Sequence, residues 1–388
     1  MDYQKNGHGI QAAAPDYEPC SEPTLYFIGV TTSHSSIMKV FPLWAQELRH
    51  PEVRIVGIVL RLHDSPYAYR RVVQHIKSDP LALGALVTTH KIDLLAAARD
   101  LFDYLDPYAE LCNEVSCISK SGDRLEGYAK DPLSAGATID EMLECQSSSI
   151  AEPADVATGV RSGGTACAHV QLAAASPGSR YFVRTGGHVL CFGAGGAAVA
   201  TVLHLAFRAE QGDRPARVIV VNRSRPRLEA LQTMLAKVQT DLKVDYVLNE
   251  DPHRNDAIMA QLPEGSLVIN ATGMGKDRPG SPITDAALFP RYGIVWEMNY
   301  RGQLTFLHQA ERQAATRALW IEDGWRYFLH GWAEVIAQVL HVEIGAPLLA
   351  RLAKIAEPAR GAAMASDTAA TIPDERFSAD VSADEQAT

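Results

Sequence analysis

Apolar and polar positions in the first part of the chain follow a pattern that predicts strands followed by helices. Short apolar runs rich in β-branched residues are typical of buried strands, and longer stretches with a period near 3.6 are typical of amphipathic helices. The predicted strands cover residues 25–30, 53–60 and 83–89, and the predicted helices cover residues 36–49, 67–78 and 92–105. Two shorter strands, 114–119 and 124–129, flank a turn at Lys120–Asp123 and predict a hairpin, and a helix is expected near 133–145.

A second block of strands and helices follows a break in this pattern. Residues 146–185 are rich in Ser, Ala, Gly and Pro, which is typical of a linker or an insertion. Beyond them the predicted strands are 188–193, 217–222, 243–248, 266–272 and 293–300, and the predicted helices are 196–209, 226–239, 253–261 and 324–341. Alternation of this kind indicates parallel βαβ units, so we expect an α/β fold with two domains and a cleft between them.

The two ends of the chain lack the large apolar side chains that a packed core needs. Residues 1–23 show no periodicity, and from residue 357 the sequence turns to Ala, Ser, Asp, Glu and Pro. Such segments bury too little surface to offset their chain entropy, so we expect disorder there. The predicted organisation is a disordered extension at 1–23, an α/β domain at 24–145, an insertion or linker at 146–185, a second α/β domain at 186–322, a helix at 323–345 that returns to the first domain, and a disordered tail at 357–388.

Composition and charge exclude several classes of protein. Hydrophobic residues make up 47% of the 388 residues, which excludes wholesale disorder. The 46 acidic residues outnumber the 36 basic ones, so general binding to nucleic acid is not expected. Six cysteines without a Cys-x-x-Cys pair, and an N-terminus unlike a signal peptide, predict reduced thiols, a cytoplasmic protein and no metal site. Residues 185–207 contain no Asp, Glu, Lys or Arg, but their glycines predict a strand, a turn and a helix rather than a membrane span.

That turn carries the first motif with chemical meaning. Gly193, Ala194, Gly195, Gly196 and Ala197 lie where a predicted strand becomes a helix. Glycines at this point permit a tight turn and a close approach to a pyrophosphate, whose charge the helix N-terminus favours. A glycine-rich turn that serves only packing is the alternative interpretation.

The second motif, Asn222–Arg227, follows the next predicted strand. An NAD site usually offers an acid here to the ribose hydroxyls, whereas this segment offers Arg223, Arg225 and Arg227 together with a serine hydroxyl. Arginine side chains match a phosphate, so the predicted ligand is NADP, with its adenosine 2′-phosphate. A solvated basic helix start is the alternative, although arginines at a helix N-terminus oppose the helix dipole.

The third motif, Asn270–Met274, is a polar, glycine-containing loop at the end of another strand of the same block. Open α/β sheets bind their ligands at the carboxyl ends of their strands, and a plain turn is the alternative. The three motifs together predict a Rossmann-type dinucleotide-binding domain.

With these motifs in this order behind a smaller α/β domain, the chain resembles the shikimate/quinate dehydrogenase family over roughly residues 24–345, excluding the insertion. The segments Trp296–Tyr300 and Asp323–Trp325 also look like family counterparts. The resemblance implies a substrate-binding and catalytic domain at 24–145, an NADP-binding domain at 186–322, and reversible NADP-linked oxidation of a ring hydroxyl. The cofactor contacts that it implies are Gly193, Ala194, Gly195, Gly196, Ala197, Asn222, Arg223, Ser224, Arg227, Asn270, Ala271, Thr272, Gly273, Met274, Met298 and Gly324.

The resemblance also implies a catalytic pair. Val87–Lys91 resembles the family segment Asn-Val-Thr-x-Pro-His-Lys, which places Lys91 in the role of the catalytic lysine. Leu125–Asp131 resembles the segment Gly-x-Asn-Thr-Asp, which places Asp131 as its partner. Hydride leaves a carbinol carbon only as the hydroxyl proton is taken up, and a lysine beside a carboxylate can relay that proton. An ordinary surface charge or salt bridge is the alternative for either residue.

Several expected substrate contacts depart from the family pattern. The segment Ala-Val-Asn-Thr reads Glu114–Cys117 here, with Ser116 in place of a substrate-binding asparagine, and Gly331 replaces a substrate-binding glutamine. The Ser-x-Ser-Pro segment is reduced to Ser33–Ser36 without its proline. A site without those groups leaves the hydroxyls of shikimate unpaired, which disfavours shikimate as the substrate. The residues expected to shape the substrate pocket are Ser35, Ser36, Thr88, Ser116 and Tyr300.

The sequence therefore predicts an NADP(H)-dependent oxidoreductase. We expect it to interconvert a ketone and a secondary alcohol on a small polar ring compound, shikimate- or quinate-like but not shikimate itself, in a specialised biosynthetic pathway. Two alternatives stay open: a non-catalytic NADP-binding regulatory protein, and an enzyme that uses the same pocket for dehydration. The expected partner is a small-molecule substrate, with no nucleic acid and no membrane, and a homodimer is an open possibility.

Overall fold

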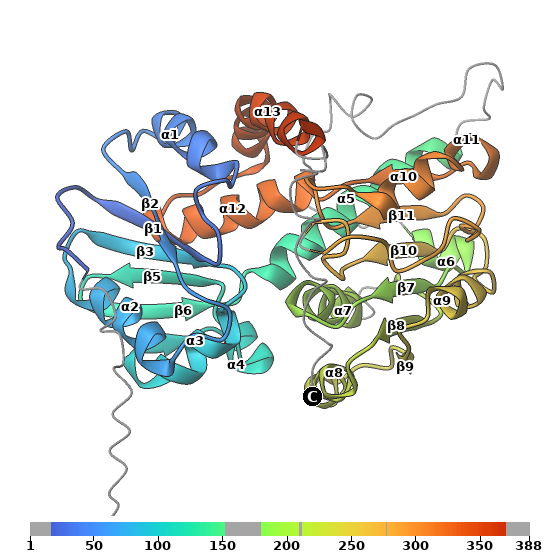
Figure 1. The fold of residues 1–388 in the computed structure, drawn as a ribbon, viewed down its shortest axis with the longest axis horizontal. Helices are drawn as coiled ribbons and strands as arrows, with labels where there is room; N and C mark the ends of the chain where they lie inside the picture. The colour runs from blue at the N-terminus through green and yellow to red at the C-terminus, as the bar shows by residue number, and fades with distance from the viewer. Residues whose placement is uncertain (1–16, 152–179, 209–211, 277, 370–388) are drawn as a thin grey trace, which may run out of the picture.

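A computed structural model describes residues 17–151, 180–208, 212–276 and 278–369 of the chain. Figure 1 shows two α/β units, the N-terminal one in blue and cyan and the other in green to orange, each with its own sheet. Helix α12 (Trp325–Leu340) packs against the first sheet and against α5 (Asp131–Ala151), which packs against α7 (Gly196–Arg208) of the second unit. The predicted α/β class with two domains is confirmed. Residues 1–16, 152–179 and 370–388, where disorder or an insertion was expected, lie outside the described residues.

The first sheet has the strand order β2-β1-β3-β5-β6-β4. Strands β1, β2 and β3 are parallel, and β5 is antiparallel to both β3 and β6, which confirms the predicted hairpin. The strands are β1 (Thr24–Gly29), β2 (Arg54–Val59), β3 (Ala82–Val87), β4 (Tyr104–Leu105), β5 (Cys117–Ser121) and β6 (Arg124–Tyr128). The helices of this unit are α1 (Ile37–Glu47), α2 (Pro66–Ser78), α3 (Lys91–Ala98) and α4 (Pro107–Cys112).

The second sheet is entirely parallel, in the order β12-β11-β10-β7-β8-β9. This is the doubly wound order of the Rossmann fold, with its first strand, β7, at the centre. The strands are β7 (Val189–Phe192), β8 (Val218–Asn222), β9 (Val244–Leu248), β10 (Leu267–Asn270), β11 (Ile294–Glu297) and β12 (Trp320–Glu322). The remaining helices are α6 (Tyr181–Thr185), α8 (Arg225–Leu235), α9 (Pro252–Met259), α10 (Thr305–Glu311), α11 (Ala314–Arg317) and α13 (Ala346–Ala369).

Both sheets are covered on their two faces, which explains why their central strands are almost continuously apolar. In β7, Val189 and Cys191 face a core that includes α5 and α7, whereas Leu190 and Phe192 face the core on the other side of the sheet. The first sheet behaves in the same way, because alternate residues of β1 belong to two different core clusters. In the described part of the chain, no helix combines the length and the apolar character that crossing a membrane requires.

Several predicted segments differ from the structure. Within the linker expected at 146–185, α5 extends to Ala151 and Tyr181–Thr185 form α6, and in the expected disordered extension Cys20 N donates to Asp79 Oδ2 (2.6 Å). The helix expected over 92–105 ends at Ala98, because a short 3-10 helix (η1, Arg99–Leu101) and strand β4 follow, and Asp103 N donates to Leu125 O (2.8 Å) beside β6. Disorder was expected from residue 357, but α13 continues to Ala369, and its buried Leu352 and Ala356 join the core that includes α1 and α12. A few well-placed apolar residues therefore anchor a helix that the composition alone does not predict. The domain boundaries themselves stay predictions.

Candidate active site

Two helix N-termini bring Lys91 and Asp131 together. Lys91 is the first residue of α3, after β3, and Asp131 is the first residue of α5, after β6. Strand β5 lies between β3 and β6 and is antiparallel to both, so the carboxyl ends of β3 and β6 lie at the same edge of the sheet. Lys91 Nζ forms an ion pair with Asp131 Oδ2, and the two side chains are only 18% and 16% exposed. The structure thus joins the two residues predicted to form the catalytic pair.

Neighbouring carboxylates keep the Lys91 ammonium charged despite burial. Burial alone would lower the pKa of Lys91, but Asp131 and Glu114 outweigh it and raise that pKa above its ordinary value. Tyr327 of α12 also hydrogen-bonds to Asp131, and burial together with the two carboxylates raises the pKa of Tyr327 well above its ordinary value. The Tyr327 hydroxyl therefore keeps its proton and donates a hydrogen bond to the Asp131 carboxylate. Helix α12 of the C-terminal part of the chain thus completes a cluster of polar groups built on the first sheet.

Glu114 is a second carboxyl beside this pair. It is 4% exposed and directly precedes Val115, whose N–H donates to Lys91 O (3.2 Å). Burial raises the pKa of Glu114 to about 7, with Lys91 opposing and Asp131 supporting the shift. Glu114 also reaches the second unit, since a Cβ built on Gly196 would lie 3.3 Å from Glu114 Oε2. The proton-transfer pair and the glycine-rich loop are therefore close neighbours.

The glycine-rich loop has the backbone that its sequence predicts. Gly193 has φ +112°, a region that L side chains rarely adopt, and a Cβ there would lie 2.5 Å from Ala271 O. Helix α7 begins at Gly196 and has no acidic residue in its first turn. The loop therefore brings strand β7 into contact with the Ala271 loop and presents a helix N-terminus that suits an anion.

The arginine segment lies beside this loop. Asn222 ends β8, and its Nδ2 donates to Ser224 O (3.2 Å), which shapes the turn before α8. Arg223, Arg225 and Arg227 are exposed, and none of them forms an ion pair with a carboxylate within the described ranges. A Cβ on Gly195 would lie 3.7 Å from Arg227 Nη1, so this guanidinium reaches back to the glycine loop. The predicted basic cluster at the dinucleotide loop is present.

A buried carboxylate, Glu297, holds the remaining predicted cofactor loops. It lies at the end of β11 with no exposed surface and accepts hydrogen bonds from Asn270 Nδ2 (2.6 Å), Asn299 Nδ2 (2.5 Å) and Asn299 N (2.9 Å). Asn270 Oδ1 in turn accepts from the backbone N–H (3.2 Å) and the hydroxyl (2.6 Å) of Thr272, and the Thr272 hydroxyl accepts from Met274 N (3.1 Å). Burial raises the pKa of Glu297 to about 7, although its hydrogen bonds oppose the shift. Glu297 therefore connects the loops after β10 and β11.

Gly324 and Met298 lie together in the same region. Gly324 N donates to Asn299 O (3.1 Å), and a Cβ on Gly324 would lie 2.1 Å from Met298 O. Glycine is therefore required where the start of α12 passes over the loop after β11. The predicted cofactor residues Gly193–Ala197, Asn222–Ser224 and Arg227, Asn270–Met274, Met298 and Gly324 all follow carboxyl ends of strands in the second sheet.

The predicted substrate residues fall into different positions. Thr88 O accepts from Lys91 N (3.2 Å), while Ser116 Oγ accepts from Lys130 N (2.7 Å), so both lie next to the pair. The Ser116 hydroxyl is buried and also lies 3.5 Å from Tyr128 O, so it ties two backbone segments together. Tyr300 packs its ring against Trp325 and Phe328. Ser35 and Ser36 lie in the loop between β1 and α1, where Ser36 is buried without capping the helix through its side chain.

Three residues of this region were not predicted as site residues. Glu297 stands in an otherwise apolar strand, and a lone carboxylate there was a usable signal. Glu114 opens the predicted hairpin at a position where the family segment has an alanine, and Tyr327 lies within a predicted helix without a local signal. Glu114 approaches Lys91 through the pairing of β3 with β5, and Tyr327 reaches Asp131 through the packing of α12 on the first unit; spacing along the sequence gives neither contact.

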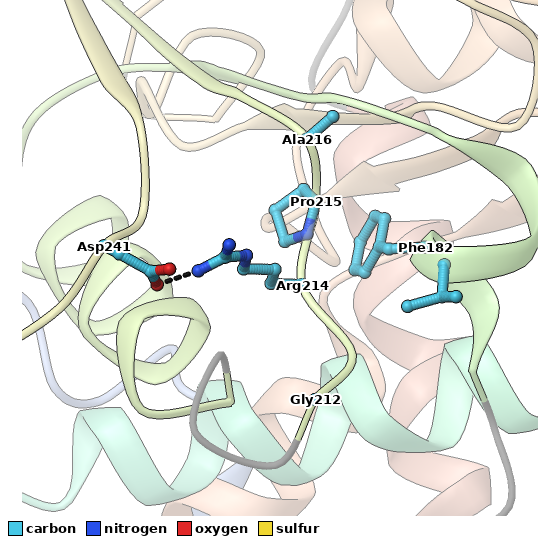
Figure 2. A pocket seen from close by; sticks show the side chains of 7 residues that line it. Phe182, Gly212, Arg214, Pro215, Ala216 and Asp241 are labelled. Atoms are coloured by element: carbon cyan, nitrogen blue, oxygen red, sulfur yellow. Dashed lines mark ion pairs between the residues drawn. The ribbon is translucent and has the colours of Figure 1, made fainter.

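A hollow elsewhere on the second unit contains none of the predicted site residues. Figure 2 shows Phe182, Arg214, Pro215, Ala216 and Asp241 lining it, with an ion pair between Arg214 and Asp241. These residues precede β7, β8 and β9, so the hollow lies at the amino ends of the strands, away from the polar loops.

Known proteins support the resemblance that the motifs predict. No model of a protein family matches the chain. The shikimate dehydrogenase (NADP(+)) of Symbiobacterium thermophilum is 36% identical over 234 residues, which are 60% of this chain and 64% of that protein. The chain thus spans less than two thirds of the length of this curated relative.

Solved structures share the fold. A shikimate 5-dehydrogenase from Listeria monocytogenes, in complex with shikimate and NAD, matches 87% of this chain and 99% of its own, with a TM-score of 0.58 and 17% identity. A quinate dehydrogenase from Corynebacterium glutamicum, in complex with NAD, matches 85% and 98%, with a TM-score of 0.58 and 17% identity. The resemblance to shikimate dehydrogenases is confirmed in the sequence, and the solved shikimate and quinate dehydrogenases share the fold of this chain.

Proposed function

We propose that this shikimate dehydrogenase-like chain is an NADP(H)-dependent oxidoreductase that interconverts a ketone and a secondary alcohol on a small polar ring compound other than shikimate. The observation that carries the proposal is that the proton-transfer pair lies beside the glycine-rich loop. Lys91 and Asp131 form a buried ion pair, and Glu114 beside them reaches Gly196 of the glycine loop. A proton-transfer group and a dinucleotide loop side by side are what hydride transfer to or from a carbinol carbon requires.

The residues of the second unit fit a dinucleotide phosphate. At Gly193 a Cβ would collide with the Ala271 backbone, so glycine lets the loop after β7 pack against the loop after β10, and Arg227 adds a guanidinium without a carboxylate partner in the described ranges. Gly193–Ala197 and Asn270–Met274 would hold the pyrophosphate and nicotinamide side, and Asn222–Arg227 would hold the 2′-phosphate. When bound, the nicotinamide would supply or accept the hydride.

The chain's own residues manage the proton. In the reducing direction, the charged Lys91 ammonium donates a proton to the carbonyl oxygen as that oxygen gains negative charge. Asp131 holds Lys91 in place and stabilises its charged form, and Tyr327 orients Asp131 through a hydrogen bond. In the oxidising direction Lys91 first releases a proton to solvent, and its neutral amine then accepts the hydroxyl proton.

The proposed substrate preference rests on the side chains that the chain offers around the Lys91–Asp131 pair. The Ser116 hydroxyl is occupied by backbone partners, and Gly331 offers no side chain. An unpaired substrate hydroxyl costs about 1–3 kcal/mol in a buried site, so a ring compound with fewer or differently placed hydroxyls is favoured over shikimate.

The test measures nicotinamide absorbance with NADP+ and, in turn, shikimate, quinate and related ring alcohols, and with NADPH and the corresponding ketones. The wild type is compared with Lys91→Ala and with the matched surface variant Lys237→Ala, an exposed lysine after α8. Turnover that is lost in Lys91→Ala and kept in Lys237→Ala supports the proposal. NADPH binding without turnover on any ring compound would favour the regulatory alternative, and product without a nicotinamide change would favour dehydration.

A further inference from the structure

Glu114 is a buried carboxyl that the proton transfer described above does not use. Its side chain is 4% exposed, and within the described residues its carboxylate accepts no hydrogen bond. A carboxylate that keeps so little contact with water and accepts no hydrogen bond is costly to ionise, because the protein replaces little of the hydration that it loses. The Glu114–Cys117 segment resembles Ala-Val-Asn-Thr, so a carboxyl stands where an alanine is expected.

The charges around Glu114 do not balance when it is ionised. Lys91 on α3 is the ammonium that faces it, and Asp131 on α5 already forms an ion pair with Lys91. The other titratable groups of the cluster are the Cys112 thiol at the end of α4 and the Tyr327 hydroxyl of α12, both of which keep their protons because burial raises their pKa. One ammonium therefore faces two carboxylates, and an ionised Glu114 is the excess negative charge.

Glu114 also faces the N-terminus of α7. A Cβ built on Gly196 would lie 3.3 Å from Glu114 Oε2 and 3.9 Å from Oε1. Under the proposed function, this 13-residue helix presents its N-terminus to the cofactor pyrophosphate. A bound pyrophosphate and an ionised Glu114 would then compete for the same positive end of one helix, and their like charges would repel across a buried region.

We infer that binding of the dinucleotide is coupled to protonation of Glu114, so that NADP(H) binds when this carboxyl is neutral. The inference rests on the proposed function, because it needs the cofactor phosphates at α7. On binding, Glu114 takes one proton from solvent and becomes a neutral carboxylic acid, while Asp131 keeps its ion pair with Lys91. Glu114 is thus a positioning residue for cofactor binding rather than a catalytic one.

The coupling predicts a specific pH dependence. In the protein without cofactor the pKa of Glu114 is about 7. Nearly all molecules therefore have a protonated Glu114 at about pH 6, and roughly one tenth have it at about pH 8. Binding limited to the neutral form therefore weakens about tenfold over this range. The 2′-phosphate of NADPH titrates near pH 6 and contributes its own pH dependence, so a variant without the carboxyl charge is needed for comparison.

The test is a fluorescence titration of NADPH at about pH 6, 7 and 8 and constant ionic strength, with wild type, Glu114→Gln and the control Glu110→Gln. Glu110 is an exposed acid on the neighbouring helix α4. We expect the apparent Kd of wild type and Glu110→Gln to rise about ten times more between about pH 6 and 8 than that of Glu114→Gln. Equal pH dependence in all three proteins would overturn the inference.

Calorimetry of the wild type alone keeps the inference testable if Glu114→Gln does not fold. Heats of NADPH binding in two buffers of different ionisation enthalpy give the number of protons taken up. At about pH 7.5, where the 2′-phosphate is already ionised, we expect uptake of about three quarters of a proton. Uptake near zero would overturn the coupling and leave the proposed function intact, whereas no NADPH binding at any pH would overturn both.

Discussion

Replacing Glu297 with glutamine should make the stability of the protein less sensitive to pH. Glu297 has no exposed surface and connects the loops after β10 and β11 through Asn270 and Asn299. Burial raises its pKa to about 7, from an ordinary value of 4.5. Because the folded-state pKa lies above the unfolded-state value, the folded protein holds an extra proton between these two values. Its stabilising effect is present at low pH and is lost as the pH rises through about 7.

The size of this effect follows from the two pKa values. Integrating the proton linkage between about pH 5.5 and about pH 8 gives a loss of about 2 kcal/mol in the free energy of unfolding from Glu297 alone. Glu114 contributes a similar pH dependence in both proteins, so it cancels when they are compared. Glu297→Gln keeps the side-chain shape and removes the titration, and it exchanges one acceptor oxygen for a donor that faces the donor groups of Asn270 or Asn299. The variant is therefore expected to be less stable than the wild type at low pH, but its free energy of unfolding should change less between about pH 5.5 and about pH 8.

The measurement is urea denaturation followed by circular dichroism at about pH 5.5 and about pH 8. The wild type should lose about 2 kcal/mol more than Glu297→Gln between the two conditions. Glu264→Gln, which alters an acid that is 65% exposed, is the control and should follow the wild type. Wild type and Glu297→Gln changing by the same amount, within about 0.5 kcal/mol, would refute the assignment of this pH dependence to the buried carboxyl.

Three further substitutions test individual parts of the site. Gly193→Ala places a Cβ 2.5 Å from Ala271 O on a residue with φ +112°. Urea denaturation should show a loss of at least about 2 kcal/mol in the free energy of unfolding, and NADPH titration should show weaker binding. Unchanged stability and binding would contradict the loop geometry. Arg227→Gln should weaken NADPH binding about tenfold and leave NADH binding nearly unchanged. Equal losses of affinity for both cofactors would show that Arg227 does not bind the 2′-phosphate. Tyr327→Phe should lower kcat about tenfold with little change in KM and in melting temperature, because Asp131 loses the hydroxyl that orients it; an unchanged kcat would make that contact purely structural.

The sequence predicts the fold well where pattern and chemistry agree. Strand β7 is apolar along its length because helices cover both faces of the sheet, and the turn after it is marked by Gly193, whose backbone conformation favours glycine. The pairing of Lys91 with Asp131 is predicted only from the resemblance to the dehydrogenase family, and the fold explains it afterwards, because each residue begins a helix after a strand and β5 lies antiparallel between those two strands. Local signals suffice for the strand and its turn.

Other parts of the site depend on packing between distant segments. Tyr327 reaches Asp131 only because α12 returns from the second sheet to the first, and Glu114 reaches Gly196 only because α5 and α7 pack together. Ser116 occupies a position typical of a substrate contact, yet its hydroxyl bonds the backbone of Lys130, which only the folded chain reveals. Helix α13 continues past residue 357, where the disordered tail was predicted to start, because Leu352 and Ala356 pack into a core that includes residues of α1 and α12.

Transfer of deuterium to a ring ketone from NADPH that carries two deuterium atoms at C4 of the nicotinamide tests the proposed function most directly. Each ketone of the panel is incubated with the wild type, Lys91→Ala and Lys237→Ala, and the alcohol product is analysed by mass spectrometry. We expect the wild type and Lys237→Ala to convert at least one ketone to an alcohol that carries deuterium on its carbinol carbon. Lys91→Ala should give no such product. Bound NADPH that passes no deuterium to any ketone, or transfer that persists in Lys91→Ala, would contradict it.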